Sequence, residues 1–186
     1  AVVDACLLAR EGVRGTDLPL EGQGGLFAML TGEGAIGDIL TGLGGVFHGP
    51  DVTLKHWPSC RGTHPYAALG LELRDRGIAA GDLVSVSLSV KPPDDMLMRP
   101  DADRKRPASM VAAKFSIPFC FGLAVCRGTL DLDSFSAEAR GDTQVLATAA
   151  KVALDRVIPR GSRERPAARV VLSDGSSLEI IVPDPP

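Results

Sequence analysis

Residues 55–65 bring together the side chains of this chain that are best suited to acid–base chemistry. The run reads KHWPSCRGTHP and holds two histidines, a lysine, an arginine and a cysteine. Lysine and arginine bind carboxylates, and histidine titrates near neutral pH, so it can accept a proton. Lys55 and Arg61 can thus hold acid groups, and His64 can take a proton from carbon. The run therefore suits proton abstraction from a polycarboxylate, with Lys55 and His64 facing a common hollow.

The same run also fits a structural explanation, which the residue types leave open. His64 can be a helix N-terminal residue bonded to a backbone group, Lys55 can lie on the surface, and Cys60 can fill a small buried space. A zinc site fits poorly, because His56, Cys60 and His64 have no obvious fourth ligand and lack the paired spacing of zinc ligands. We predict no metal site.

Two other patterns bear on cofactors and redox state. Gly32-x-Gly34-x-x-Gly37 has the spacing of a dinucleotide-binding loop, but it follows the helix-like run LFAML instead of a strand. We predict that these glycines end helices and that no cofactor binds. The chain has four cysteines without a CxxC pair, so we expect reduced thiols and no disulfides.

The elements on either side of the run predict how it is held. Residues 51–57 are bounded by prolines and contain β-branched residues, which indicates a short strand. Thr63 is suited to cap a helix that has Pro65 in its first turn and ends near Gly77. The run then lies at a junction of strand, loop and helix, where unpaired backbone N–H groups gather.

Two further segments predict strands. In residues 84–90, valine and leucine alternate with serine, which is typical of a strand with one buried and one wet face. Residues 168–182 form two apolar runs around Asp174-Gly175, which predicts a hairpin.

The remaining segments predict helices and one long loop. The first helix is expected to end near Gly12, and residues 36–40 suggest another short helix. Residues 91–106 are rich in proline and charge, which indicates a long loop. Residues 110–126 suit a buried helix that Pro118 interrupts, and Asp142 is expected to cap an amphipathic helix containing Val145, Leu146, Ala149, Val152, Ala153 and Val157.

This order of elements predicts an α+β fold, with a small antiparallel or mixed sheet backed by helices. Helical material precedes it, and we expect the boundary near Gly49 and Pro50. Because the chain opens at Ala1 already within a helical pattern, we expect it to be part of a longer protein.

Composition limits the possible partners and location. The net charge of -3 and the sequence pI near 5.6 give no basic surface for nucleic acid. No apolar run is long enough to span a bilayer, and the N-terminus does not read as a signal peptide. We expect a cytoplasmic protein that binds neither nucleic acid nor membrane.

Lys55 through Pro65 resembles the KxYPxCxxxHP segment of the MmgE/PrpD family of 2-methylcitrate dehydratase-like proteins. The similarity extends to Ala9-Arg10-x-Gly12-Val13-x-Gly15 before the run, and to Lys114-Phe115-Ser116-Ile117-Pro118-Phe119 and Leu172-x-Asp174-Gly175 after it. Any one of these pieces is common, but their order along nearly the whole chain is specific. The chain is similar to the C-terminal portion of that family.

The resemblance implies a large all-helical domain carrying a smaller α+β domain, with the active site between them. Residues 1–49 would belong to the helical domain and residues 50–186 to the small domain. His64 would transfer a proton and Lys55 would hold a carboxylate, while Cys60, Arg61 and Ser116 would contact substrate. Cys60 stands where some relatives have a further active-site histidine.

The implied function is that of a lyase in propionate catabolism, a cofactor-independent dehydratase of a hydroxylated di- or tricarboxylate such as 2-methylcitrate. Epimerases and decarboxylases of the same family, and a non-catalytic assembly domain or remnant, stay open as alternatives. The family's aspartate-rich N-terminal motif is not among these residues, so this portion alone is expected to be inactive. We expect a homodimer, or association with the helical portion.

Overall fold

Tertiary contacts divide the chain into two units, Ala1–Thr53 and Leu54–Pro186. The structure is a computed structural model that describes residues 1–31 and 41–184. The predicted helix at 36–40 and the Gly32, Gly34 and Gly37 motif lie outside the described residues. The two units are therefore described separately.

The first unit holds short helices that bury little of their own surface. α1 (Val2–Arg10) ends before Gly12, which has φ +90, so the predicted end of this helix is confirmed. α2 (Leu26–Thr31) and the 3-10 turn η1 (Gly49–Asp51) follow. No residue of α1 is buried.

The predicted strand at residues 51–57 is wrong. After η1 the chain has no regular structure up to Trp57, and the side chains of Val52 and Leu54 are 70% and 93% exposed. A strand needs a neighbour for its backbone hydrogen bonds, and no described strand pairs with this segment. Its β-branched residues do not overcome the lack of a partner.

The helix after this segment forms where the sequence predicts it. The 3-10 turn η2 (Arg61–Thr63) leads into α4 (His64–Asp75), with Pro65 in the first turn and Gly77 at φ +80 just beyond the end. Thr63 occupies the N-cap position, but its hydroxyl makes no cap bond. It donates instead to the carbonyl oxygen of Cys60 at 2.7 Å, which fixes the turn before the helix.

Within the described residues, four strands form one sheet in the order β2-β1-β3-β4. The strands are β1 (Leu83–Val90), β2 (Val152–Val157), β3 (Ala167–Leu172) and β4 (Ser177–Ile181). β1 is parallel to β2 and antiparallel to β3, and β3 and β4 form the predicted hairpin. The mixed sheet confirms the α+β fold class.

The alternation in β1 is confirmed except at its start. Val86, Leu88 and Val90 are fully buried, whereas Val84 is 54% exposed. The register against β3 shifts between Leu83 and Ser85, so Leu83 takes the buried position in place of Val84.

The segment predicted as a long loop contains helical turns. η3 (Asp94–Met98) and the short helix α5 (Asp101–Lys105) lie within it, and Leu97 and Met98 are buried. These two apolar side chains join the main core, which orders the backbone around them.

The helix predicted at residues 110–126 is interrupted just before Pro118, which lies in the first turn of its second part. α6 (Met110–Lys114) ends before Ser116, and α7 (Ile117–Arg127) starts with Pro118 in its first turn. Proline is tolerated there because the N–H that it lacks has no partner within the helix.

Asp142 caps α9 (Thr143–Ala150) as predicted, but the helix is shorter than expected. η4 (Asp133–Phe135) and α8 (Ala137–Arg140) precede it. Val152, Ala153 and Val157, which were predicted on its apolar face, lie in β2 and pair with β1. A run of small and β-branched residues can form a helix or a strand. Here it forms a strand because the edge of β1 is free to pair with it.

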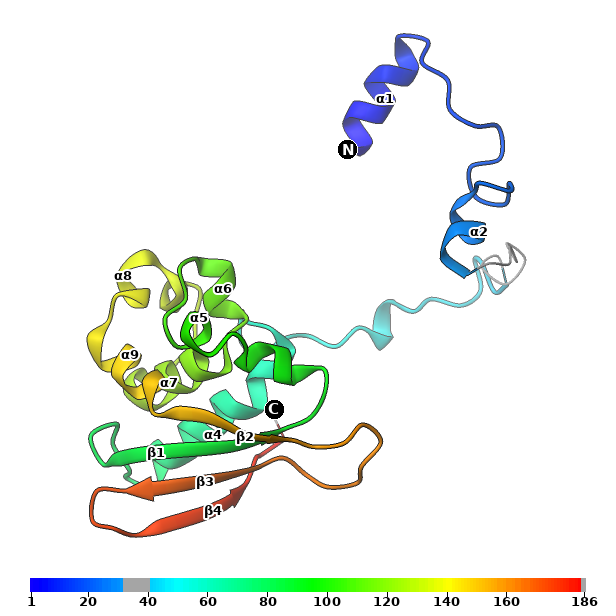
Figure 1. Ribbon diagram of the computed structural model, residues 1–186. Helices are drawn as coiled ribbons and strands as arrows, with labels where there is room; N and C mark the ends of the chain where they lie inside the picture. The colour runs from blue at the N-terminus through cyan, green and yellow to red at the C-terminus, as the bar shows by residue number, and fades with distance from the viewer. Residues whose placement is uncertain (32–40, 185–186) are drawn as a thin grey trace. The chain divides into compact units, whose positions relative to one another are not determined.

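The helices of the second unit gather on one side of the sheet, and Figure 1 shows the opposite side without a helix. One cluster of buried side chains lies between the sheet and the helices, and includes Leu69, Val86, Leu88 and Phe121. A second cluster joins α4, α7 and α9 around Leu123 and includes Trp57. Among the described residues, no helix is long and apolar enough to cross a membrane.

Candidate functional site

An open hollow of about 630 Å³ lies beside the residues that the sequence singles out. Lys55 and His56 line it together with Trp57 and Pro58. The side chains of Lys55 and His56 are exposed. Residues 130–133, of sequence Leu-Asp-Leu-Asp, line it as well. No hydrogen bond or ion pair to the described residues holds the Lys55 ammonium group, so it is available to an anion in the hollow.

His64 lies next to this hollow but does not line it. The residue begins α4 and is only 3% exposed. The Trp57 ring packs edge-on against the His64 ring, with 5.2 Å between centroids, and makes a similar contact with His56 at 4.8 Å. Lys55 therefore lines the hollow, whereas the imidazole of His64 is buried and packs against Trp57.

The two ring nitrogens of His64 have different surroundings. Nε2 is buried and has no hydrogen-bond partner among the described residues. Backbone groups of Trp57 and Ser59 act on the ring as hydrogen-bond partners that raise its pKa, and because Nε2 has no partner we assign these contacts to Nδ1. We assign the proton of the neutral ring to Nδ1, where it is donated to carbonyl oxygens, so that Nε2 carries a free lone pair.

The electrostatics keep this imidazole neutral. Burial lowers the pKa of His64 most, and the positive charges of Lys55 and Arg61 lower it further, against the opposing effect of its backbone hydrogen bonds. A neutral ring with a free lone pair can act as a base. The backbone contacts agree with the alternative in which His64 is a helix N-terminal residue bonded to a backbone group. They use one ring nitrogen, and Nε2 keeps its lone pair.

Cys60 and Arg61 lie in the turn that leads to His64. The Cys60 N–H donates to the carbonyl oxygen of Lys114 at 2.8 Å, and its half-buried side chain packs against the main core. Arg61 is exposed, and its charge acts on His64. Cys60 thus faces the core more than the hollow, and neither residue is among those lining the hollow around Lys55.

Ser116 has a structural position. It is fully buried, its hydroxyl accepts a hydrogen bond from the Phe119 N–H at 3.0 Å, and it donates one to the carbonyl oxygen of Arg104. These bonds cap α7 and use the hydroxyl within the protein. We find no surface of Ser116 that a substrate can reach in this arrangement.

Asp94 is a candidate that sequence reasoning missed. A Cβ atom at Gly62 would lie 2.6 Å from Asp94 Cγ, so the carboxyl group packs directly on the turn before His64. Burial raises the pKa of Asp94, and the charge of Asp95 raises it further. In the sequence, Asp94 is marked only by its neighbour Asp95. The pair was not singled out because residues 91–106 contain many charged residues and were predicted to form a loop.

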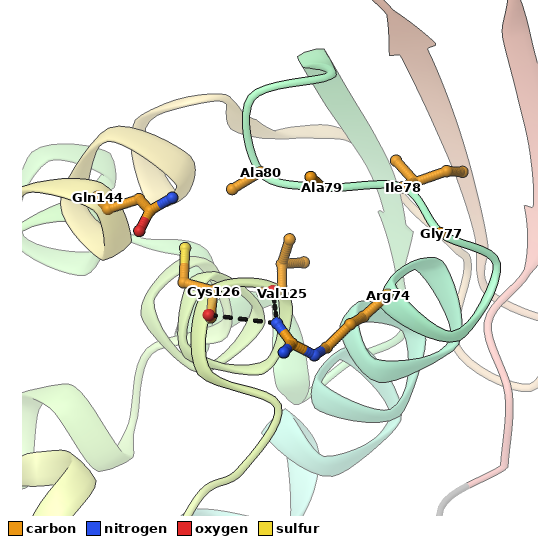
Figure 2. A pocket seen from close by; sticks show the side chains of 8 residues that line it. All are labelled: Arg74, Gly77, Ile78, Ala79, Ala80, Val125, Cys126 and Gln144. Atoms are coloured by element: carbon orange, nitrogen blue, oxygen red, sulfur yellow. Dashed lines mark hydrogen bonds between the residues drawn. The ribbon is translucent and has the colours of Figure 1, made fainter.

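A separate hollow of about 310 Å³ lies between the end of α4, the turn before β1, α7 and α9 (Figure 2). Arg74 Nη1 donates to the carbonyl oxygens of Val125 and Cys126 at 3.1 and 3.3 Å, so its guanidinium group satisfies the end of α7. Burial raises the pKa of the Cys126 thiol, which makes it a poor nucleophile at neutral pH. None of the predicted site residues lines this hollow.

Among the described residues, no group of three histidine, cysteine, aspartate or glutamate side chains is placed to hold a metal ion.

Most of the chain matches the profile of a known protein family. The profile of the MmgE/PrpD C-terminal domain matches residues 57–186. No curated protein gives a significant match. The matched region starts at Trp57, includes His64, and extends through the hairpin to the last residue. The chain belongs to the MmgE/PrpD family, of which it carries the C-terminal domain.

Proposed function

We propose that this domain forms one wall of the active site of a lyase that dehydrates a hydroxylated di- or tricarboxylate. Lys55 binds a substrate carboxylate, and His64 Nε2 removes the proton from the adjacent carbon. The electron pair of that C–H bond moves into the carboxylate as an enediolate, which the ammonium group stabilises. Elimination then forms the carbon–carbon double bond and expels the hydroxyl group as water.

The observation that carries this proposal is the state of His64. A neutral imidazole whose Nδ1 is anchored to the backbone and whose Nε2 has no partner is prepared to accept a proton. A buried polar atom without a partner costs about 1–3 kcal/mol, which favours a chemical use for it. The adjoining Lys55 supplies the positive charge that a carboxylate substrate needs.

Departure of the hydroxyl group requires an acid, and Asp94 is our candidate within this domain. Its raised pKa keeps the carboxyl group protonated to a higher pH than usual. The carboxyl group contacts Gly62, which precedes His64 by two residues in the sequence. Protonated carboxyl groups serve as general acids in this way. Arg61 can orient a second carboxylate from the exposed side of the same turn.

The test is to assay the complete gene product with 2-methylcitrate, cis-aconitate and iminodisuccinate, and to follow exchange of the substrate proton in deuterated water. We expect His64→Gln to lower kcat by roughly 100-fold or more, since general base catalysis contributes that much. Lys55→Met should mainly raise KM. The products distinguish dehydration from decarboxylation and epimerisation, which share the first step.

His48 provides the matched control, because its exposed ring pairs with Asp51 in the first unit. His48→Gln should leave kcat and proton exchange unchanged. Proton exchange that proceeds at the normal rate in His64→Gln would rule out His64 as the base.

A further inference from the structure

His64 presents a problem that its assignment as a base does not solve. Its Nε2 has the lone pair needed for proton transfer, yet the residue is 3% exposed and the nitrogen has no contact with the hollow that Lys55 lines. A base must come within hydrogen-bond reach of the proton that it removes. In the arrangement described here, a substrate held by Lys55 meets the indole of Trp57 first.

Trp57 borders both the hollow and the ring of His64. It is 8% exposed, lines the hollow, and contacts the ring of His64 edge-on at 5.2 Å between centroids. Its other ring contact is with the exposed His56. The residue also joins the cluster around Leu123, so one indole belongs both to the core and to the wall of the hollow.

The chain just before Trp57 is exposed, whereas the chain just after it is held by hydrogen bonds. Before Trp57 the chain has no regular structure, and the side chains from Val52 to His56 are exposed. Ser59, by contrast, is held by a 2.8 Å hydrogen bond between its hydroxyl and that of Thr63, and the Cys60 N–H is bound by Lys114. The carbonyl oxygen of Trp57 accepts a 2.9 Å hydrogen bond from the Ser59 N–H, so the backbone stays in place and the indole swings by rotation about its side-chain bonds.

We propose that Trp57 is a gate between the Lys55 hollow and His64, and that the indole must swing out before Nε2 can exchange a proton with a bound polycarboxylate. This inference rests on the proposed function for the identity of the ligand, but the cover over His64 can be tested without one. Trp57 acts through His64 and is a positioning residue. Gating of this kind also keeps water away from the base until substrate binds.

The chain is suited to a direct test, because it has three histidines and one tryptophan. Diethyl pyrocarbonate modifies neutral, accessible imidazoles, and mass spectrometry of peptides measures the rate at each histidine separately. We expect His64 to react roughly tenfold or more slowly than the exposed His48 and His56, because it reacts only when the cover opens. Trp57→Leu should raise the His64 rate by about the same factor, since Leu leaves most of the indole space empty.

Leu123→Ala is the matched control. Leu123 is fully buried in the same cluster as Trp57, so its truncation loosens that cluster without removing the indole. It should leave the His64 rate close to that of the unaltered chain. A Trp57→Leu chain that keeps His64 protected, or an unaltered chain in which His64 reacts as fast as His56, would overturn the gate. Equal acceleration in Leu123→Ala would overturn it too, because loosening alone would then explain the effect.

Citrate serves as the probe for ligand-driven opening, with binding measured by calorimetry and the position of the indole by tryptophan emission. We expect citrate to shift the emission to longer wavelength, and Lys55→Met to abolish the shift. Binding at Lys55 without any change in emission overturns the gate and leaves the proposed function standing. Absence of binding counts against the proposed function, while the reactivity of His64 in Trp57→Leu still decides the gate.

Discussion

At the scale of single residues, the candidate site combines groups that the fold holds at some cost. His64 keeps one nitrogen without a partner, and Asp94 keeps a carboxyl group against Gly62 where burial raises its pKa. Polar groups in such states lower stability, and proteins retain them where function requires it. Stability measurements can therefore reveal which of these residues belong to the site.

Asp94→Asn should stabilise the chain, and more so as pH rises. A raised native pKa means that the folded chain binds more protons than the unfolded chain between the two pKa values, so stability falls as pH rises through that window. The penalty is absent below the ordinary value of 3.8 and complete above the raised one. Asparagine removes it, and urea unfolding between pH 3 and neutral pH measures the difference.

The exposed Asp17→Asn serves as the control and should show no such trend. A stability difference between Asp94→Asn and the unaltered chain that stays constant with pH would contradict this interpretation of Asp94.

At the scale of elements, small residues set the distances between the helices that support the site. A Cβ atom at Gly122 in α7 would lie 2.8 Å from the carbonyl oxygen of Val145 in α9, and one at Gly70 in α4 would lie 2.8 Å from Cβ of Ala124. The three helices therefore approach closely at α7, which contains Cys120 and is capped by Ser116.

Gly122→Ala should destabilise the chain by about 1–3 kcal/mol, because the added methyl group meets backbone that can move only if α9 moves. Gly81→Ala is the matched control, since nothing lies within 4 Å of its added Cβ atom. The control should be neutral or slightly stabilising. Equal free energies of unfolding for the two variants would contradict the close packing of α7 and α9.

The sequence predicts those elements whose signal is local. Asp174-Gly175 specifies its hairpin by turn chemistry, and Asp142 caps α9 through its own carboxylate. Val152–Val157 was misassigned because its strand depends on the edge of β1, which is distant in the sequence. Residues 51–57 fail for the converse reason, since they have strand-forming residues but no neighbouring strand.

The same distinction applies to the site. The closeness of Lys55 and His64 along the chain follows from the run that contains both, and the family match begins between them at Trp57. The cover by Trp57 and the position of Asp94 depend on tertiary packing, which no spacing in the sequence encodes. Ser116 shows why the sequence alone does not identify a substrate-binding residue. A serine that caps a helix and a serine that binds substrate differ only in what surrounds the hydroxyl group.

At the scale of the whole molecule, the two units differ in how much they bury. Every buried hydrophobic side chain in the described residues lies at Trp57 or later. The first unit instead leaves large apolar side chains exposed, among them Val2, Met29, Leu43 and Phe47. Apolar surface of this kind is typical of a region that packs on other protein.

A chain shortened to residues 54–186 should therefore melt at the same temperature as the full chain, because it keeps the entire core. It should also self-associate less in size-exclusion chromatography, since the exposed apolar side chains are gone. A chain shortened further to residues 66–186 loses Trp57 and His64 and should melt at a clearly lower temperature. A large drop in melting temperature on removing residues 1–53 alone would show that they stabilise the core.

The place of β1 in the sheet has a consequence for synthesis. β1 lies between β2 and β3, both of which follow it after more than half of the second unit's sequence has been made. Its sequence, LVSVSLSV, has no charge and no proline, which is the composition of segments that aggregate when their edges are free. On the ribosome, this strand emerges before either of its partners, so both of its edges stay unpaired until β2 and β3 have been made.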